Sequence, residues 1–378
     1  MRKSQKKTSR KKTGFGKFIR MVMISANIFV ALCLLLTYLC CFVSPKFVWW
    51  IGFFGLAYIY LFAANLCFAA GWLIFGKKKL ALISLIVVGI GWNMIGKNIQ
   101  LFEKKLPDAK AETALKVISF NVHMFSQRDA VQPDGTQLNM FDYLRESAVD
   151  IICMQEFMST KWVDDLTETV IRKQFDQMPY YYLEQTIGAV GIATFSKYPI
   201  VRKQLIYSDN TTNACIFCDV IIDSDTVRVY NIHLKSVGFT MEERALLDNV
   251  VKKEYNNEDV GMMKAMIRQM AAASVRRARQ VNMVSEHISA SPYPVIICGD
   301  FNDPPASYSY RKIRGDKKDA FVESGKGRST TYNIGDVSSQ RIDYIMHSSD
   351  FMSYDYESPR VRLSDHFPVM CRLVKANK

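Results

Sequence analysis

Long apolar stretches dominate the first quarter of the chain, where residues 18–96 carry charge at only a few positions. The stretches cover residues 21–43, 47–75 and 80–95. A helix needs about 20 apolar residues to cross the hydrocarbon core of a bilayer. The pattern therefore predicts three transmembrane helices, and the third is the shortest. A cleaved signal peptide is disfavoured, because more membrane-type sequence follows the first stretch.

The pattern changes after a polar segment, residues 97–112, that we expect to be a linker. From there, short apolar runs rich in β-branched residues alternate with helical patterns, as in sheets covered by helices. The strand-like runs cover residues 115–120, 150–154, 190–195, 214–222, 227–232, 294–298, 342–346 and 369–374, and the helical patterns cover residues 137–148, 158–174 and 260–288. Residues 113–378 are thus predicted to form one α/β domain with at least two packed layers.

Charge follows the same division. The whole chain has a formal net charge of +13, but residues 1–112 contain 17 basic and 3 acidic side chains, whereas residues 113–378 have a net charge of −1. The basic residues gather in segment 1–20, before the first apolar stretch. A basic tail can bind nucleic acid, but beside a membrane span it is typical of the cytoplasmic side.

These observations predict the organisation and location of the protein. We expect a basic cytoplasmic tail at 1–20, a three-span anchor at 21–96, a linker at 97–112 and a catalytic domain at 113–378. With three spans, the domain lies on the outer, periplasmic side of a bacterial-type inner membrane, and the lipid bilayer is a partner. The spans lack the charged residues that mark an ion path, so a channel or transporter is disfavoured. No obligate protein partner is evident from the sequence.

Two smaller patterns have ordinary structural explanations. Cys215 and Cys218 form a CxxC motif, but a second ligand pair does not accompany it, so buried free thiols are the favoured interpretation. Residues i and i+3 of a strand also point to opposite faces. The methionines of segment 260–288 indicate core packing more strongly than a lid or a lipid-contacting surface.

The candidate chemistry lies where the strand-like runs end. The polar residues at these ends are Asn121 and His123, Gln155 and Glu156, Asn231 and His233, Asp300 and Asn302, Asp343, and Asp365 and His366. Carboxylate and amide oxygens are hard ligands suited to Mg²⁺ or Mn²⁺. The imidazoles add groups that accept protons or donate them toward phosphate oxygens.

Taken together, these segments resemble the endonuclease/exonuclease/phosphatase superfamily over residues 115–374. The resemblance rests on several short motifs in the family order. They are Ser119-Phe120-Asn121, Met154-Gln155-Glu156, residues 191–199 (GIATFSKYP), Asn231-Ile232-His233-Leu234, Gly299-Asp300-Phe301-Asn302, Arg341-Ile342-Asp343-Tyr344 and Ser364-Asp365-His366. The resemblance implies a deoxyribonuclease I-like four-layer αββα sandwich, here preceded by the three predicted transmembrane helices.

The resemblance also implies roles for the motif residues. The metal, Mg²⁺ or Mn²⁺, would be held by Glu156 as principal ligand, with Asn121 and Asp365 nearby. The catalytic residues would be Asp300 and Asn302, which orient the attacking water, His366 paired with Asp343, and His233 on the scissile phosphate. The sequence leaves open whether Asp300 or His366 takes the proton of the water.

Ordinary alternatives exist for single residues. Asn121 could cap a strand end, Asp343 could form an ion pair with Arg341, and His123 is expected to be a surface or supporting residue. The joint occurrence of Glu156 with the other motif residues favours a site.

The sequence thus predicts metal-dependent hydrolysis of a phosphoester by an activated water. A domain with a net charge of −1 lacks the general excess of positive charge with which proteins grip long nucleic acids. We therefore place a phospholipid head group or another small phosphodiester ahead of nucleic acid as substrate. A catalytically silent membrane protein that uses the same fold for binding is the alternative.

Overall fold

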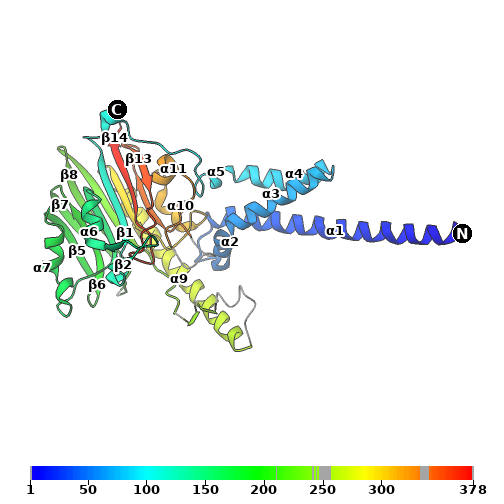
Figure 1. Ribbon diagram of the computed structural model, residues 1–378, viewed down its shortest axis with the longest axis horizontal. Helices are drawn as coiled ribbons and strands as arrows, with labels where there is room; N and C mark the ends of the chain where they lie inside the picture. Colours follow the sequence, from blue (N-terminus) through cyan, green and yellow to red (C-terminus); the bar gives the residue numbers. More distant parts are fainter. Residues whose placement is uncertain are drawn as a thin grey trace.

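The molecule consists of a helical part and a two-sheet domain. The computed structural model describes residues 2–376 except 210, 241, 244, 247–256 and 333–339. The helical part extends to one side of the domain, with α1 carrying the N-terminus far from it (Figure 1).

Of the predicted spans, the first is formed most clearly. The helices of this region are α1 (Arg2–Cys40), the 3-10 helix η1 (Trp49–Ile51), α2 (Gly52–Leu56), α3 (Tyr58–Ile74), α4 (Lys78–Ile90) and α5 (Trp92–Ile95). Within α1, Gly14–Cys40 has 27 residues and is, in the described residues, the one helix that is long and apolar enough by itself. At 1.5 Å per residue it is ~40 Å long, which exceeds the ~30 Å hydrocarbon core.

The second and third spans are not confirmed. The second predicted stretch is bent by 62° between Trp49–Leu56 and Tyr58–Ile74, and it counts as a span only if this bent pair is taken as one. Helix α4 has 13 residues, which gives ~20 Å and falls short of the bilayer core. Glycines interrupt the third stretch at its end, where Gly91 separates α4 from the short α5.

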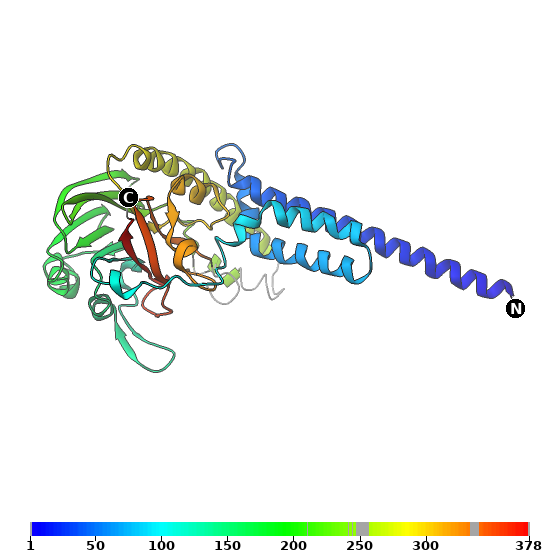
Figure 2. The same cartoon turned by 90° about the horizontal axis from the view of Figure 1, so that it is seen from above.

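Buried polar groups join the helices α1, α3 and α4, which lie side by side (Figure 2). The Asn27 amide donates to Ser84 Oγ at 2.6 Å and accepts from Trp72 Nε1 at 2.9 Å, so one residue of α1 holds both other helices. The outward surface is apolar instead, with Phe29 67% and Ile86 59% exposed. Small polar groups that join helices beneath an apolar exterior are typical of helices packed in lipid.

Two six-stranded sheets form the domain. The first has the order β13 (Phe351–Glu357), β14 (Val369–Lys375), β1 (Leu115–Asn121), β4 (Ile151–Met158), β6 (Val190–Ser196) and β5 (Tyr180–Ile187). The second has the order β11 (Lys318–Asp319), β12 (Asp343–His347), β10 (Val295–Asp300), β9 (Asp225–His233), β8 (Ala214–Ile222) and β7 (Ile200–Ser208). A small hairpin joins β2 (Asp129–Val131) to β3 (Gln137–Asn139).

Three apolar clusters define four layers. The central cluster lies between the sheets and includes Val117 and Cys153 of the first and Val229 and Cys298 of the second. The outer face of the first sheet packs against α6 (Met140–Glu146) and α7 (Glu168–Gln174), and that of the second packs against α9 (Asn257–Ser289) and α10 (Tyr308–Arg314). Helix α11 (Ala320–Ser324) lies beside β12 and β13. The order is therefore helices, sheet, sheet, helices, as in the αββα sandwich that the resemblance implied.

The local predictions are confirmed for the central strands and corrected at other places. All eight strand-like runs form strands, whereas the edge strands β5, β7, β11 and β13 and the hairpin β2–β3 were not predicted. The helix predicted over 137–148 begins only at Met140, because Gln137–Asn139 pairs with β2. The helix predicted over 158–174 begins only at Glu168, because Met158 still belongs to β4 and an irregular segment follows. Cys215 and Cys218 are buried free thiols on opposite faces of β8, as expected.

The methionines of α9 divide between the two expected environments. Met266 is buried, as core packing requires, whereas Met262 is exposed. The prediction of core packing is therefore confirmed for Met266 and wrong for Met262.

Candidate active site

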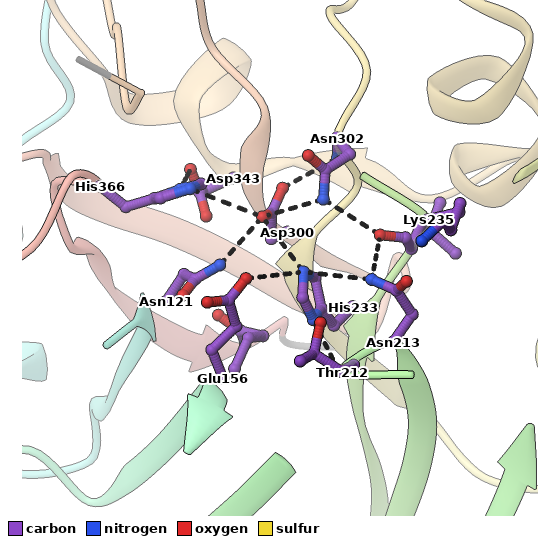
Figure 3. Close-up of polar contacts among 12 residues, drawn as sticks. Asn121, Glu156, Thr212, Asn213, His233, Lys235, Asp300, Asn302, Asp343 and His366 are labelled. Carbon is purple, nitrogen blue, oxygen red and sulfur yellow. Dashed lines mark hydrogen bonds and ion pairs between the residues drawn. The ribbon is translucent and has the colours of Figure 1, made fainter. Parts of the chain in front are cut away.

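The predicted site residues gather at one edge of the two sheets. Strands β1 and β4 run parallel to each other, as do β9 and β10, so their carboxyl ends meet there. Asn121, Glu156, His233 and Asp300 stand at or next to these ends, and Figure 3 shows their side chains converging. Asp343 joins them because β12 is antiparallel to β10 and begins opposite Asp300.

Two backbone irregularities shape this edge. The register between β4 and β6 shifts between Gln155 and Phe157, and the intervening Glu156 has a φ of 50°. Such a bulge redirects a side chain, here toward the site, at a cost in backbone strain. Gly299 precedes Asp300 with a φ of 151°, and a Cβ at this position would collide with the carbonyl oxygen of Ile232 on β9. The glycine is therefore required for the close approach of β9 and β10 at the site.

Asp300 occupies the centre of the cluster. It is 1% exposed, and its Oδ2 accepts from the amides of Asn121 and Asn302, both at 3.2 Å. The backbone N–H of Asn302 donates to Asp300 Oδ1 at 2.8 Å. The Nε2 atoms of His233 and His366 lie 3.7 and 3.8 Å from the same Oδ2. The two imidazoles and two amides thus point at one carboxylate.

His366 and Asp343 form a buried pair. His366 Nδ1 lies 3.0 Å from Asp343 Oδ2, and this contact leaves Nε2 directed at Asp300. The backbone N–H of Asp343 donates to Thr331 Oγ1 at 3.0 Å, which fixes the start of β12. Arg341 binds Asp319 instead, with Nη2 at 2.8 Å from Oδ2. The alternative interpretation of Asp343 as the ion-pair partner of Arg341 is therefore wrong.

His233 is oriented by groups of the β7–β8 loop. Its Nδ1 lies 3.0 Å from the carbonyl oxygen of Thr212 and donates to it, which directs Nε2 inward. Nε2 is 3.7 Å from Glu156 Oε1 and 3.4 Å from the Asn213 amide nitrogen. His233 thus faces the space between Glu156 and Asp300.

The third predicted metal ligand, Asp365, lies beside this group. Its Oδ1 is 3.4 Å from His123 Nδ1, so His123 supports Asp365 at the rim. Ser364 Oγ donates to the Asn121 carbonyl oxygen at 2.8 Å and holds this segment to the end of β1. In the described part of the chain, no hydrogen bond or ion pair joins Asp365 to Glu156 or to the Asn121 side chain.

Burial and mutual charge shift the protonation of the central groups. Burial and the nearby Asp343 carboxylate raise the pKa of Asp300 to about 6, although the two imidazoles oppose the shift. Burial lowers the pKa of His366, but Asp343 and Asp300 outweigh it and raise the value to about 10. His366 therefore carries a positive charge at neutral pH.

The donor set fits a divalent cation. Asp300, Asp343 and His366 form a buried group whose ligand-type atoms lie within 4.8 Å of one another. The Glu156 carboxylate is only partly buried, at 17% exposure, and lies next to Asn121 across the β1–β4 pair. These hard oxygen atoms match the preferences of Mg²⁺.

Comparison with known families identifies the family of the domain. The endonuclease/exonuclease/phosphatase family matches residues 118–366, and a domain of unknown function (DUF8431) matches residues 19–98. The chain belongs to the endonuclease/exonuclease/phosphatase family, whose members are typically hydrolases that act on phosphoester bonds. No curated protein matches the chain.

Solved structures with similar folds include proteins of different names. An endonuclease/exonuclease/phosphatase from Beutenbergia cavernae is 14% identical, with 70% of this chain and 72% of that chain covered and a TM-score of 0.47. D. rerio TDP2 complexed with single-strand DNA product is 15% identical, with 69% and 99% covered and a TM-score of 0.48. Sphingomyelinase C from Streptomyces griseocarneus is 15% identical, with 68% and 99% covered and a TM-score of 0.41.

The sequence did not indicate several supporting residues. Thr212, Asn213 and Thr331 orient His233 and Asp343, but each lies in a loop outside any strand-end motif. Short polar residues are common in turns, so their type alone carried no signal. Ser364 belongs to the motif Ser364-Asp365-His366, but only the structure indicates that it holds the end of β1.

Proposed function

We propose that the protein is a membrane-tethered, divalent-metal-dependent phosphodiesterase. The observation that carries the proposal is the convergence of Glu156, Asn121, His233, Asp300 and His366 at one sheet edge. Bound there by Glu156 and Asn121, with Asp365 at the rim, Mg²⁺ or Mn²⁺ would supply neutralisation of phosphoryl charge and acidification of a nearby water.

The side chains around the proposed metal position have separate roles in the reaction. Asp300 is the general base, because its carboxylate lies at the centre of the polar contacts, and Asn302 holds that carboxylate through its amide and its backbone N–H. His366, charged and fixed by Asp343, donates from Nε2 toward a phosphoryl oxygen. His233, held through Nδ1, faces the scissile phosphate from the other side. Two imidazoles on either side of a phosphate stabilise the charge that develops on its oxygens.

We place a phospholipid-type phosphodiester first among the substrates and nucleic acid second. The domain has a net charge of −1 over residues 113–378, which gives no general attraction for a long polyanion. The loop that follows Asn302 also touches the anchor, since the Cys40 thiol donates to the Ala306 carbonyl oxygen at 3.1 Å and Gly55 lies against the same oxygen. The sheet edge that bears the site therefore adjoins the outer ends of α1 and α2, where lipid head groups would lie.

A substrate panel on the full chain in uncharged detergent tests the proposal. The panel comprises bis(4-nitrophenyl) phosphate, sphingomyelin, phosphatidylglycerol, single-stranded and duplex DNA, and RNA, each with Mg²⁺, with Mn²⁺ and with a chelator. We expect turnover that the chelator abolishes and that is highest, among the natural substrates, on a phospholipid.

The Glu156→Gln variant should reduce turnover at least 100-fold, because it removes one charged ligand. Glu168→Gln, at an exposed carboxylate on α7, is the matched control and should retain turnover. Absence of hydrolysis on every substrate would contradict the proposal and favour the silent binding protein. Nucleic acid as the best substrate would overturn the order of substrates but not the chemistry.

The membrane placement is a separate part of the proposal. The span Gly14–Cys40 and the basic residues before it support a cytoplasmic N-terminus and an outer catalytic domain. Reporter fusions after Lys12 and Lys378 in bacterial cells would test this orientation. A cytoplasmic signal from the C-terminal fusion would overturn it.

A further inference from the structure

A pocket of about 530 Å³ lies between the helical anchor and the catalytic domain. Its walls come from four places: the end of α1, the α4–α5 junction, the last turns of α9, and α10. None of the candidate catalytic or metal-binding residues lines it. The pocket is therefore separate from the site described above.

Positive charge is concentrated in the wall of this pocket. Lys97, Arg311, Lys312 and Arg314 line it, and among the described residues that line it there is no aspartate or glutamate. Within the described part of the chain, none of the four forms an ion pair with a carboxylate. Arg314 Nε donates to the Lys317 carbonyl oxygen at 3.1 Å, and the nearest acidic influence on its charge is Asp316, whose pKa it helps to lower. Arg311 and Lys312 are exposed, whereas Lys97 and Arg314 are half-buried, so the four cations together attract an anion to the mouth of the pocket.

The pKa of Lys97 is lowered in this environment. Burial lowers its pKa, and the positive charges of Arg314 and Arg341 lower it further, although Cys41 and Asp319 oppose the shift. Its Nζ has an aromatic neighbour, 5.5 Å from the centre of the Tyr310 ring. A bound anion would relieve the repulsion among these cations.

The same pocket has an apolar side. Tyr38, Phe42, Ile90 and Met94 line it from the anchor, and Phe42 and Ile90 are 62% and 64% exposed. The guanidinium of Arg311 lies 4.1 Å from the centre of the Phe42 ring, so charge and apolar surface adjoin directly. This combination suits a molecule with an anionic head and a hydrocarbon tail.

The position of the pocket along the anchor favours a membrane lipid as its ligand. The pocket begins where the span Gly14–Cys40 ends, and the exposed Trp92 stands next to its lining residue Asn93. Tryptophans gather at membrane interfaces, so this level corresponds to the head groups of the outer leaflet. Both cartoon views place the junction of anchor and domain here (Figures 1 and 2).

We propose that this pocket binds an anionic phospholipid of the outer leaflet, with its phosphate among Lys97, Arg311, Lys312 and Arg314 and an acyl chain along Phe42 and Ile90. The bound lipid joins α10 to the ends of α1 and α4 and so holds the catalytic domain against the bilayer. The inference rests on the membrane placement proposed above and not on the hydrolytic activity.

Calorimetric titration of the full chain in uncharged detergent, with a chelator present and with the Glu156→Gln change in every variant so that the lipid is not hydrolysed, tests this binding. The titrants are dioctanoyl phosphatidylglycerol, dioctanoyl phosphatidylcholine and inorganic phosphate. We expect saturable binding of phosphatidylglycerol, at least tenfold weaker binding of phosphatidylcholine, and weak binding of free phosphate. The double variant Arg311→Gln/Lys312→Gln should weaken the binding of phosphatidylglycerol at least tenfold.

Matched controls separate a site from general charge. Arg202→Gln/Lys203→Gln removes two adjacent exposed cations on β7, the far edge strand of the second sheet, and should leave the affinity unchanged. The thermal unfolding midpoint without lipid should be the same for both variants, which shows that α10 is folded. Equal losses in both variants, no loss in either, or free phosphate binding as tightly as phosphatidylglycerol would overturn the proposal. Because no step is catalytic, an inactive enzyme would not affect the result.

Discussion

The helical anchor and the catalytic domain both use buried polar groups to join elements that are otherwise held by apolar contact. In the anchor, Asn27 links α1 to Trp72 of α3 and Ser84 of α4. In the domain, Asn231 of β9 donates to the Ala193 carbonyl oxygen at 2.8 Å and accepts from Gln155 at 2.7 Å, which links the two sheets. Apolar contact is non-directional, so these few hydrogen bonds specify which elements meet and in which register.

The two regions differ in their exteriors and in what their polar interiors do. The anchor exposes large apolar side chains all along its helices, whereas the domain surrounds its apolar clusters with polar surface. In the domain, the polar interior continues from Gln155 to Glu156 and reaches the site, so structural and chemical groups are neighbours in the sequence. The anchor has no such continuation among its described residues. Substitutions in the polar interior of the domain should therefore change activity, whereas substitutions in the polar interior of the anchor should change only the packing of its helices.

The largest effect should come from Asp343→Asn. The change removes the charge that holds His366 in its protonated form, and we expect kcat on bis(4-nitrophenyl) phosphate to fall about 10²–10⁴-fold. Asp134→Asn, on an exposed turn, and Asn27→Leu, in the anchor, should each leave kcat within about twofold. A comparable loss in Asn27→Leu would contradict the separation of the two regions.

Gly299→Ala should give the next largest effect, on the stability of the domain. A methyl group there would meet the Ile232 carbonyl oxygen, and the φ of 151° disfavours any side chain. We expect a loss of about 3 kcal/mol in the free energy of unfolding. Gly261→Ala, in open space on α9, is the control and should be neutral or slightly stabilising. Urea unfolding followed by the protection of the β9 and β10 amides from hydrogen exchange measures both, and equal values would show that β9 and β10 can separate without cost.

Asn231→Leu and Asn27→Leu compare the two polar interiors directly. In the domain, the substitution removes the shortest hydrogen bond of the buried Gln155 amide and the bond from Asn231 to the Ala193 carbonyl oxygen. We expect a loss of about 1–3 kcal/mol in the free energy of unfolding. In the anchor, the corresponding loss should be about 0.6 kcal/mol, because hydrogen bonds between membrane helices are worth less than expected from their burial. The domain loss is measured by urea and the anchor loss by unfolding in mixed micelles. A larger loss for Asn27→Leu than for Asn231→Leu would mean that the anchor is packed like the core of a water-soluble protein.

The smallest effect is electrostatic and should be confined to the domain. Burial raises the pKa of Glu323, but the hydrogen bonds from His347 and the Ser353 backbone outweigh it and lower the value to about 2. A depressed pKa stabilises the fold above the unfolded value of 4.5, and this contribution is lost as the pH falls toward 2. Glu323→Gln should therefore cost about 1 kcal/mol at pH 7 and much less at pH 2.5. The exposed Glu146→Gln is the control for both pH values, and a pH-independent difference would show that Glu323 acts by shape alone.

Local pattern predicted the central strands and the strand-end residues, but it did not predict the sheet edges. β1, β4 and β10 are buried on both faces and are rich in apolar residues in the sequence. β5 and β7 bury their side chains only in part. Their sequences therefore mix apolar residues with polar and charged ones and do not stand out as strands. The candidate site shows the same limit, since Glu156 and Asp300 stand in strand-end motifs whereas Asn213 and Thr331 stand in loops.

The sequence by itself determined the alternation of strands and helices, the separation of a basic, apolar first part from a nearly neutral domain, and the residue types at the strand ends. These are local properties, because hydrophobic period and charge depend on neighbours along the chain. Only the tertiary structure decided which charged side chains pair with each other. Arg341 is two residues from Asp343 but binds Asp319, whereas His366, 23 residues away, binds Asp343. Only the tertiary structure shows that the first apolar stretch is one long helix and that the second is bent by 62°, close to the contact of Gly55 with the loop carrying Ala306. Such pairings depend on which strand ends and helix ends the fold brings together, and spacing along the chain does not contain that information.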